Sequence, residues 1–144
     1  MNKIELVKEE NNFFKDWIKK EWANHNETDL FYQLDLNAEI IFSQEEFYYK
    51  IMLNKEMVGF VGLILKDDKL FDSHTLYLYR LYIDSEYRNL GIGTAVIKEL
   101  IKMAREMKRD IELECTGNNP AIHLYERMGF KVNYKNMILK LDKK

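Results

Sequence analysis

The chain has 144 residues, of which 47% are hydrophobic and 32% are charged, and its formal net charge is −2. This length fits one compact domain, so we expect a single domain over residues 1–144. The near-neutral charge argues against disorder and against sequence-independent binding to nucleic acid. The lone cysteine, Cys115, excludes an internal disulfide framework and makes a reducing, cytoplasmic location the expectation. The charged N-terminal stretch and a longest apolar run of only 57–65 indicate neither export nor membrane insertion.

Hydrophobic spacing in the first third of the chain predicts a short strand followed by two helices. Residues 4–6 are typical of a strand, and aromatic and aliphatic residues recur at helical spacing over 13–22. Asn26 and Thr28 are candidate caps of a second, shorter helix, because apolar residues follow within 30–34.

Three consecutive strands are expected next, over 47–53, 57–65 and 74–83. The two-residue turn at Asn54 and Lys55 is short enough to make the first two of these strands antiparallel, and a turn at residues 67–68 does the same for the next pair. The third strand is apolar or aromatic on both faces except at Arg80, which is typical of an interior strand covered on each side.

The second half of the chain predicts helices alternating with short strands. A single apolar stripe predicts a helix over 92–107, and alternation predicts a strand over 111–115. A further helix is expected from Pro120 to Gly129. Val132 and 137–141 are then expected to form a terminal pair of strands. The predicted order βααβββαβαββ describes an α/β (α+β) fold with a mixed, mostly antiparallel central sheet flanked by helices.

A turn with two glycines, from Arg88 to Thr94, leads directly into the helix expected over 92–107. The first N–H groups of a helix lack internal partners and lie at the positive end of its dipole, so such a turn binds anions. Gly91 and Gly93 would let a phosphate approach the backbone closely, although glycines that serve only a tight connection give the same pattern. The turn lacks the Lys-Ser/Thr of a P-loop, and Val96 stands where a dinucleotide fingerprint needs its third glycine.

Two motifs together resemble the GNAT superfamily of N-acyltransferases over about residues 47–141. The first is Arg88-x-x-Gly91-x-Gly93 after a strand that ends in Leu81-Tyr82-Ile83-Asp84, and the second is Asn118-x-x-Ala121-Ile122-x-Leu124-Tyr125-Glu126-x-x-Gly129-Phe130. Two departures are visible: Ser85 stands where many members have proline, and the connection from Glu114 to Asn118 is about one residue short.

The resemblance implies acetyl-CoA as the acyl donor. It implies that backbone groups of Leu81, Tyr82 and Ile83 hold the pantetheine arm and the thioester, and that Asn118 hydrogen-bonds the arm from the other side. The pyrophosphate would be wrapped by the residues of the turn, namely Arg88, Asn89, Leu90, Gly91, Ile92, Gly93 and Thr94.

The implied reaction is direct attack of a neutral amine on the thioester carbonyl. By resemblance, the backbone N–H of Ile83 would stabilise the oxyanion and Tyr125 would be the acid for the departing thiolate. Glu114 is the chosen base, with Glu112 behind it. Alternatively, Glu114 is a surface carboxylate or pairs with Arg80, and water relays the proton.

The amine acceptor itself is not legible in the sequence. Acidic residues surround the entrance that the resemblance implies, and they would attract a cationic amine: Glu27, Asp29, Asp35, Glu39, Glu45 and Glu46. Trp17 and Trp22 fit a helix core better than a substrate cage. The three histidines lack a ligand spacing, so no metal is expected.

The resulting hypothesis is an acetyl-CoA-dependent N-acetyltransferase acting on a primary amine of a small molecule or of a protein. A non-catalytic acyl-CoA-binding module and a nucleotide-binding regulatory domain are the alternatives. The oligomeric state does not follow from the sequence, and a homodimer is among the assemblies left open.

Overall fold

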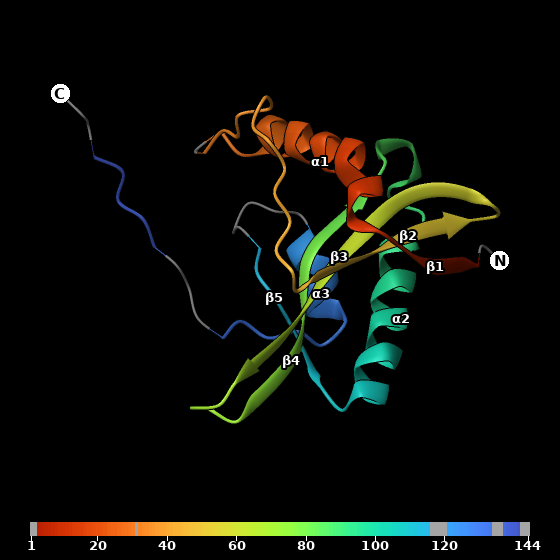
Figure 1. The fold of residues 1–144 in the computed structure, drawn as a ribbon, viewed down its shortest axis with the longest axis vertical. Helices are drawn as coiled ribbons and strands as arrows, with labels where there is room; N and C mark the ends of the chain where they lie inside the picture. Colours follow the sequence, from red (N-terminus) through yellow and green to blue (C-terminus); the bar gives the residue numbers. More distant parts are fainter. Residues whose placement is uncertain (1–2, 31, 116–120, 134–136, 142–144) are drawn as a thin grey trace.

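The computed structural model describes residues 3–30, 32–115, 121–133 and 137–141 as a five-stranded sheet with three α-helices (Figure 1). Two short 3-10 helices, η1 and η2, precede α1 and α2. In chain order the elements are β1 (Ile4–Glu9), η1 (Asn11–Phe14), α1 (Lys15–Thr28), β2 (Glu46–Leu53), β3 (Glu56–Asp68), β4 (Ser73–Ile83), η2 (Ser85–Tyr87), α2 (Ile92–Met107), β5 (Asp110–Leu113) and α3 (Ala121–Arg127).

The strands follow the order β1-β2-β3-β4-β5, and among these described strands only the β4–β5 pair is parallel. The prediction of a mixed, mostly antiparallel sheet is therefore confirmed, as are three consecutive antiparallel strands with β4 in the interior. Asn54 and Lys55 both have positive φ, +49° and +72°. This is the backbone of a two-residue hairpin turn that matches the twist of its strands.

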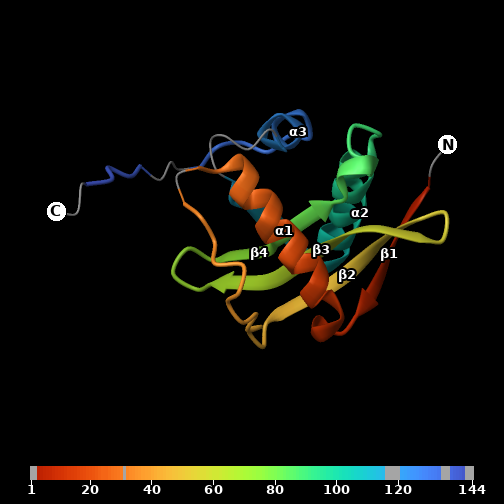
Figure 2. The same ribbon diagram turned by 90° about the horizontal axis from the view of Figure 1, so that it is seen from above.

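The two faces of the sheet carry separate hydrophobic clusters, because successive strand residues point to opposite sides. Phe60 belongs to the cluster under α1, whereas the next residue, Val61, belongs to the cluster under α2 and α3. The α1 cluster consists of the buried residues Phe14, Ile18, Ile40, Tyr48 and Phe60, with Trp17 and Trp22 packed against it. Both tryptophans thus pack, partly buried, against this core cluster, as the helix-core interpretation expects. Helices α2 and α3 lie beside each other in both views (Figure 1, Figure 2).

The predicted helix after Thr28 is wrong for the residues that the structure describes. Residues 29, 30 and 32–45 contain no helix, and Asn26 and Thr28 lie in the last turns of α1 instead. The Asn26 side chain accepts a hydrogen bond from the N–H of Leu34 at 2.7 Å and donates one to its carbonyl at 2.9 Å. The N–H and carbonyl of Leu34 thus bond to a side chain instead of to the backbone of a helical turn. The helical spacing of apolar residues therefore does not produce a helix there.

Side chains of α1 also hold further residues of the segment 29, 30 and 32–45, which we call the α1 loop. Lys19 donates to the carbonyl of Leu36 at 2.8 Å and to that of Ala38. Inside the loop, Gln33 donates to the carbonyls of Asn26 and Asp29. The loop therefore has a defined path without regular secondary structure.

The predicted terminal strands are also wrong for the described residues, because Val132 and 137–141 are not in strands. Figure 1 shows the chain leaving the domain after α3. Met137, Leu139 and Leu141 are exposed. An apolar run becomes a strand only where a neighbouring edge pairs with it, and among the described residues no strand pairs with Val132 or 137–141. Residues 134–136 lie outside the described part.

The buried face of α2 and the end of α3 agree with the features that the sequence predicts. The predicted stripe of α2 is buried at Ile92, Val96, Leu100 and Ala104. Gly129, with φ of +101°, ends α3, and the N–H of Phe130 bonds to the carbonyl of Tyr125. The expected first residue of this helix, Pro120, lies outside the described residues.

None of the helices in the described part of the chain is long and apolar enough to cross a membrane.

Candidate active site

Strand β4 contains a bulge near its middle, and its pairing with β5 ends there. Gly62 of β3 lies opposite Arg80, but the next residue, Leu63, lies opposite Leu78, so Tyr79 is an extra residue in β4. Pairing with β5 stops just before this point, at Leu78 and Leu113. Beyond the bulge, β4 is paired with β3 alone among the described strands. We call the other side of residues 79–83 the free edge.

The backbone groups of Leu81 and Ile83 point to the free edge. The N–H of Asp84 donates to the carbonyl of Val58 on the β3 side at 2.8 Å, so the backbone of Tyr82 also faces β3. Leu81 and Ile83 alternate with these residues and face the opposite way. The Ile83 carbonyl confirms this direction, because it accepts a 2.8 Å bond from Nε of Arg88. The structure thus separates Tyr82 from the other two predicted thioester contacts.

The turn from β4 into α2 leaves the first amides of that helix without internal partners. Asn89 and Gly91 have positive φ, +61° and +82°, and Gly91 caps α2 without any side-chain bond. Ala95 is the first α2 residue shown bonding back, to the carbonyl of Gly91 at 3.1 Å. The N–H groups of residues 92–94 are therefore free of α-helical bonds and lie at the positive end of the dipole. This is an anion-binding geometry.

The two glycines of the turn have different surroundings. A Cβ at Gly91 would meet nothing within 4 Å, whereas a Cβ at Gly93 would lie 3.0 Å from Cδ2 of Leu124 in α3. Gly91 thus leaves open space beside the turn, where a ligand can approach. The small size of Gly93 instead serves the packing of α2 against α3.

Arg88 links the turn to the end of β4 and to α1. Besides its bond to Ile83, it donates to Oδ1 of Asn24 at 3.3 Å, and its guanidinium carbon lies 5.4 Å from the ring centre of Tyr82. Leu90, at the outer part of the turn, is more than half exposed. The predicted cofactor residues 81, 83 and 88–94 thus lie along one continuous segment, whereas the backbone of Tyr82 faces β3.

Tyr125 lies on the inner side of α3, with only 8% of its surface exposed. Its ring packs edge-on against Phe130, and it belongs to the same core cluster as Leu78 and Ile92. Burial raises the pKa of its hydroxyl to about 12, with a smaller contribution from Cys115. The hydroxyl makes no hydrogen bond to any residue within the described ranges.

The two carboxylates considered as bases are placed differently. Glu114 is exposed and immediately follows β5. Glu112 accepts bonds from Lys66 at 2.8 Å and Thr75 at 3.3 Å, near the start of β4. It lies opposite Tyr77, four residues before Leu81 and hence about 13 Å along the strand. This position argues against Glu112 as the second candidate. Asn118 lies outside the described residues.

Arg80 is held from the other face of the sheet, by Glu21 of α1 and Tyr48 of β2. The sequence did not reveal Glu21 as this partner, and the only signal was the lone charge of Arg80 in an apolar strand.

Two acidic residues assigned to the acceptor entrance are also buried and bonded. Asp29 accepts from the N–H of Tyr32, and Glu46 accepts from Ser43 and Tyr48. The other four, Glu27, Asp35, Glu39 and Glu45, are exposed.

If Glu114 is the base, Glu114→Gln is expected to slow acyl transfer most at low pH. A primary amine has a pKa near 10.4, so the need to remove its proton grows as the pH falls. Steady-state rates between pH 6 and 9 measure this, and CoA should still stabilise the variant. A pH profile equal to that of the unmodified protein would assign proton removal to water.

Comparison with known proteins agrees with this geometry. Residues 11–130 match the family model described as "Acetyltransferase (GNAT) family". Human N-acetyltransferase 8 is 28% identical over 116 residues, which cover 78% of this chain and 51% of that protein. Spermine/spermidine N(1)-acetyltransferase of Bacillus subtilis (strain 168) is 33% identical over 99 residues, covering 63% of this chain and 65% of that protein. The chain thus spans about half to two thirds of these relatives.

Among solved structures, ribosomal-protein-alanine N-acetyltransferase from Brucella melitensis biovar Abortus 2308 superposes with a TM-score of 0.71 at 16% identity, covering 96% of this chain and 99% of that one. At this identity the likeness concerns the fold alone. The chain combines an α+β fold with a bulged β4, a free edge and a helix start without a side-chain cap. Given the family match over most of its length, the chain belongs to the GNAT family of N-acetyltransferases.

Proposed function

We propose that this protein transfers the acetyl group of acetyl-CoA to a primary amine of a small molecule or of a protein by direct attack. The observation that carries the proposal is the continuity between the free edge and the start of α2. One segment, 81–94, offers strand amides for a thioester and an anion-binding turn for a pyrophosphate.

The residues present fit acetyl-CoA. The open space beside Gly91 gives the turn a cradle that any larger residue would fill. The amides of residues 92–94 supply donors for phosphate oxygens, and those of Leu81 and Ile83 supply donors along an apolar strand. Acetyl-CoA would bring the activated acetyl group, whose carbonyl is the electrophile.

The chain's own groups would then manage charge and protons. The Ile83 N–H points to the free edge and would stabilise negative charge that develops on the carbonyl oxygen. The Tyr125 hydroxyl, whose pKa burial raises to about 12, is protonated at neutral pH and can donate to the departing thiolate. Glu114 or water would accept the proton of the attacking amine.

The acceptor would approach from the side of α1 and the α1 loop. Glu27, Asp35 and Glu39 are exposed there and would attract a cationic amine. A polyamine is one acceptor of this kind, and the name of the Bacillus subtilis relative states activity on spermine and spermidine.

The deciding experiment is release of free thiol from acetyl-CoA in the presence of a panel of amines. The panel should contain spermidine, an aminoglycoside, a lysine peptide and a peptide with a free α-amino group. Thiol release that depends on one of these amines supports the proposal and identifies the acceptor class. Tight CoA binding without release for any amine would instead favour a non-catalytic acyl-CoA-binding module.

A cofactor-binding turn of this kind predicts selective stabilisation by CoA. At about 100 times its Kd, CoA or acetyl-CoA should add roughly 2.7 kcal/mol and raise the Tm, whereas NAD should not. Thermal unfolding with each compound measures the difference. An equal shift with NAD, or no shift with CoA, would contradict the cofactor assignment.

A further inference from the structure

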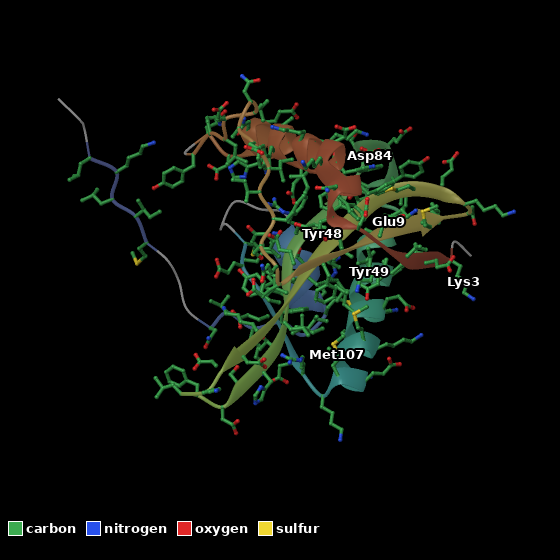
Figure 3. All side chains as sticks on the ribbon, in the orientation of Figure 1. Lys3, Glu9, Tyr48, Tyr49, Asp84 and Met107 are labelled. Atoms are coloured by element: carbon green, nitrogen blue, oxygen red, sulfur yellow. The ribbon has the colours of Figure 1, made fainter. Side chains whose placement is uncertain are left out.

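A row of three residues crosses the sheet at the β4 bulge. Tyr48 of β2 lies opposite Gly62 of β3, which in turn lies opposite Arg80 of β4. A Cβ at Gly62 would lie 2.5 Å from Cε2 of Tyr48. The missing side chain therefore lets the Tyr48 ring lie across β3 and reach Arg80. Figure 3 marks Tyr48 on the sheet below α1.

Arg80 makes three contacts that converge on the bulge. Its Nε donates to the Tyr48 hydroxyl at 3.0 Å, and NH1 donates to Oε1 of Glu21 at 2.9 Å. Its guanidinium carbon also lies 4.8 Å from the ring centre of Tyr79, the extra residue of the bulge. The side chain thus ties β4 to β2 and to α1 at the residue before Leu81.

The network is largely buried, and each of its side chains bonds at least one other member. The exposed fractions of the Arg80 and Glu21 side chains are 17% and 21%, and Tyr48 is fully buried. Tyr48 donates onward to Glu46, which also accepts from the N–H of Ser43. Burial raises the pKa of the Glu21 carboxyl, and the neighbouring Arg80 opposes this. A paired and buried network of this type fixes one geometry, because alternative arrangements would leave a charge without a partner.

We propose that Arg80, held by Glu21 and Tyr48, is a positioning residue that fixes the β4 bulge and so aims the Leu81 and Ile83 amides at the acetyl carbonyl. The inference rests on the proposed function, because it assigns the acetyl group to the free edge. Arg80 itself lies on the α1 side of the strand and acts through the backbone that follows it.

The test compares Arg80 with Arg109, an arginine between α2 and β5 that bonds the start of β4. Arg80→Lys keeps a charge for Glu21 but removes the planar group that also bonds Tyr48. Arg109→Lys is the matched control, since the Arg109 side chain is also 17% exposed and bonds Asp67 and the Thr75 carbonyl at the start of β4. Tyr48→Phe is a milder second variant that leaves the pair of Arg80 and Glu21 in place.

Arg80→Lys is expected to lower kcat by about 10- to 100-fold, because misplacing a reacting group by about 1 Å costs rates of this order. KM for acetyl-CoA should stay within about threefold, since the turn 88–94 is unchanged. Tyr48→Phe should lower kcat less, and Arg109→Lys should leave it unchanged despite a similar loss of Tm. An equal fall in kcat for both arginine variants, or none in a folded Arg80→Lys protein, would overturn the proposal.

A binding measurement separates this inference from the proposed reaction. Calorimetry with CoA and acetyl-CoA gives the ratio of their Kd values, which reports the contacts of the acetyl group alone. Arg80→Lys should weaken the binding of acetyl-CoA by up to about threefold and leave the binding of CoA unchanged, even if no acceptor supports turnover. An unchanged ratio refutes positioning by Arg80, whereas absent thiol release with a changed ratio refutes only the proposed reaction.

Discussion

Tyr125→Phe is expected to lower turnover about 100-fold while CoA affinity stays nearly unchanged. A general acid contributes about 10² to 10⁴ in rate, and the low end applies here because a thiol with a pKa near 8.5 is already a tolerable leaving group. The loss should appear in kcat, since the hydroxyl would act only as the thiolate departs. Single-turnover rates with acetyl-CoA and a working amine measure it.

The substitution is well suited to this question because of where Tyr125 lies. The ring packs against Phe130 and phenylalanine keeps this contact, so folding should be affected little. Since burial raises the pKa of the hydroxyl to about 12, the acid form is present throughout pH 6 to 9, and the loss should be constant over that range. Turnover within about threefold of the parent, with chemistry limiting, would make Tyr125 a packing residue.

Gly91→Val is expected to abolish stabilisation by CoA in a protein that still folds. At φ of +82° a β-branched residue is strained by about 1–3 kcal/mol, so the turn would either hold strain or change its path. In either case the branched side chain would occupy the open space in which phosphate approaches. Thermal unfolding with and without CoA tests both effects together.

Gly129→Val provides a matched control for this experiment. Gly129 also has a positive φ, +101°, and a Cβ there would also meet nothing within 4 Å, but it ends α3 and lies outside the turn. Both variants should lose stability, and only the Gly129 variant should regain it with CoA. CoA binding of unchanged affinity by a folded Gly91→Val protein would refute the proposed phosphate position.

The central part of the fold could be predicted because its signals are local. Asn54 and Lys55 form a tight turn between two apolar strands, and the stripe of α2 is continuous. The second helix after Thr28 failed for a non-local reason. Asn26 bonds the backbone of Leu34 eight residues away, and helical spacing of apolar residues carries no information about such a bond.

The candidate site likewise has one part that local sequence signals predict and another part that depends on non-local contacts. The anion-binding turn is contiguous in sequence, so its glycines and its place before a helix could be recognised. The bulge at Tyr79 and the partner of Arg80 could not, because Glu21 lies 59 residues away and only the packing of α1 on the sheet brings it near. The roles of Glu114 and Asn118 stay predictions.

The α1 loop is held by α1, whereas the turn 88–94 is the connection between β4 and α2. Lys19 and Asn26 of α1 bond the loop backbone at Leu36 and Leu34, whereas Arg88 of the turn bonds the Ile83 carbonyl of β4 and also Asn24 of α1. We therefore expect the loop to tolerate insertions and deletions without loss of CoA binding. During evolution, acceptor preference could then drift through changes of this loop alone, while a single donor was retained across the lineage.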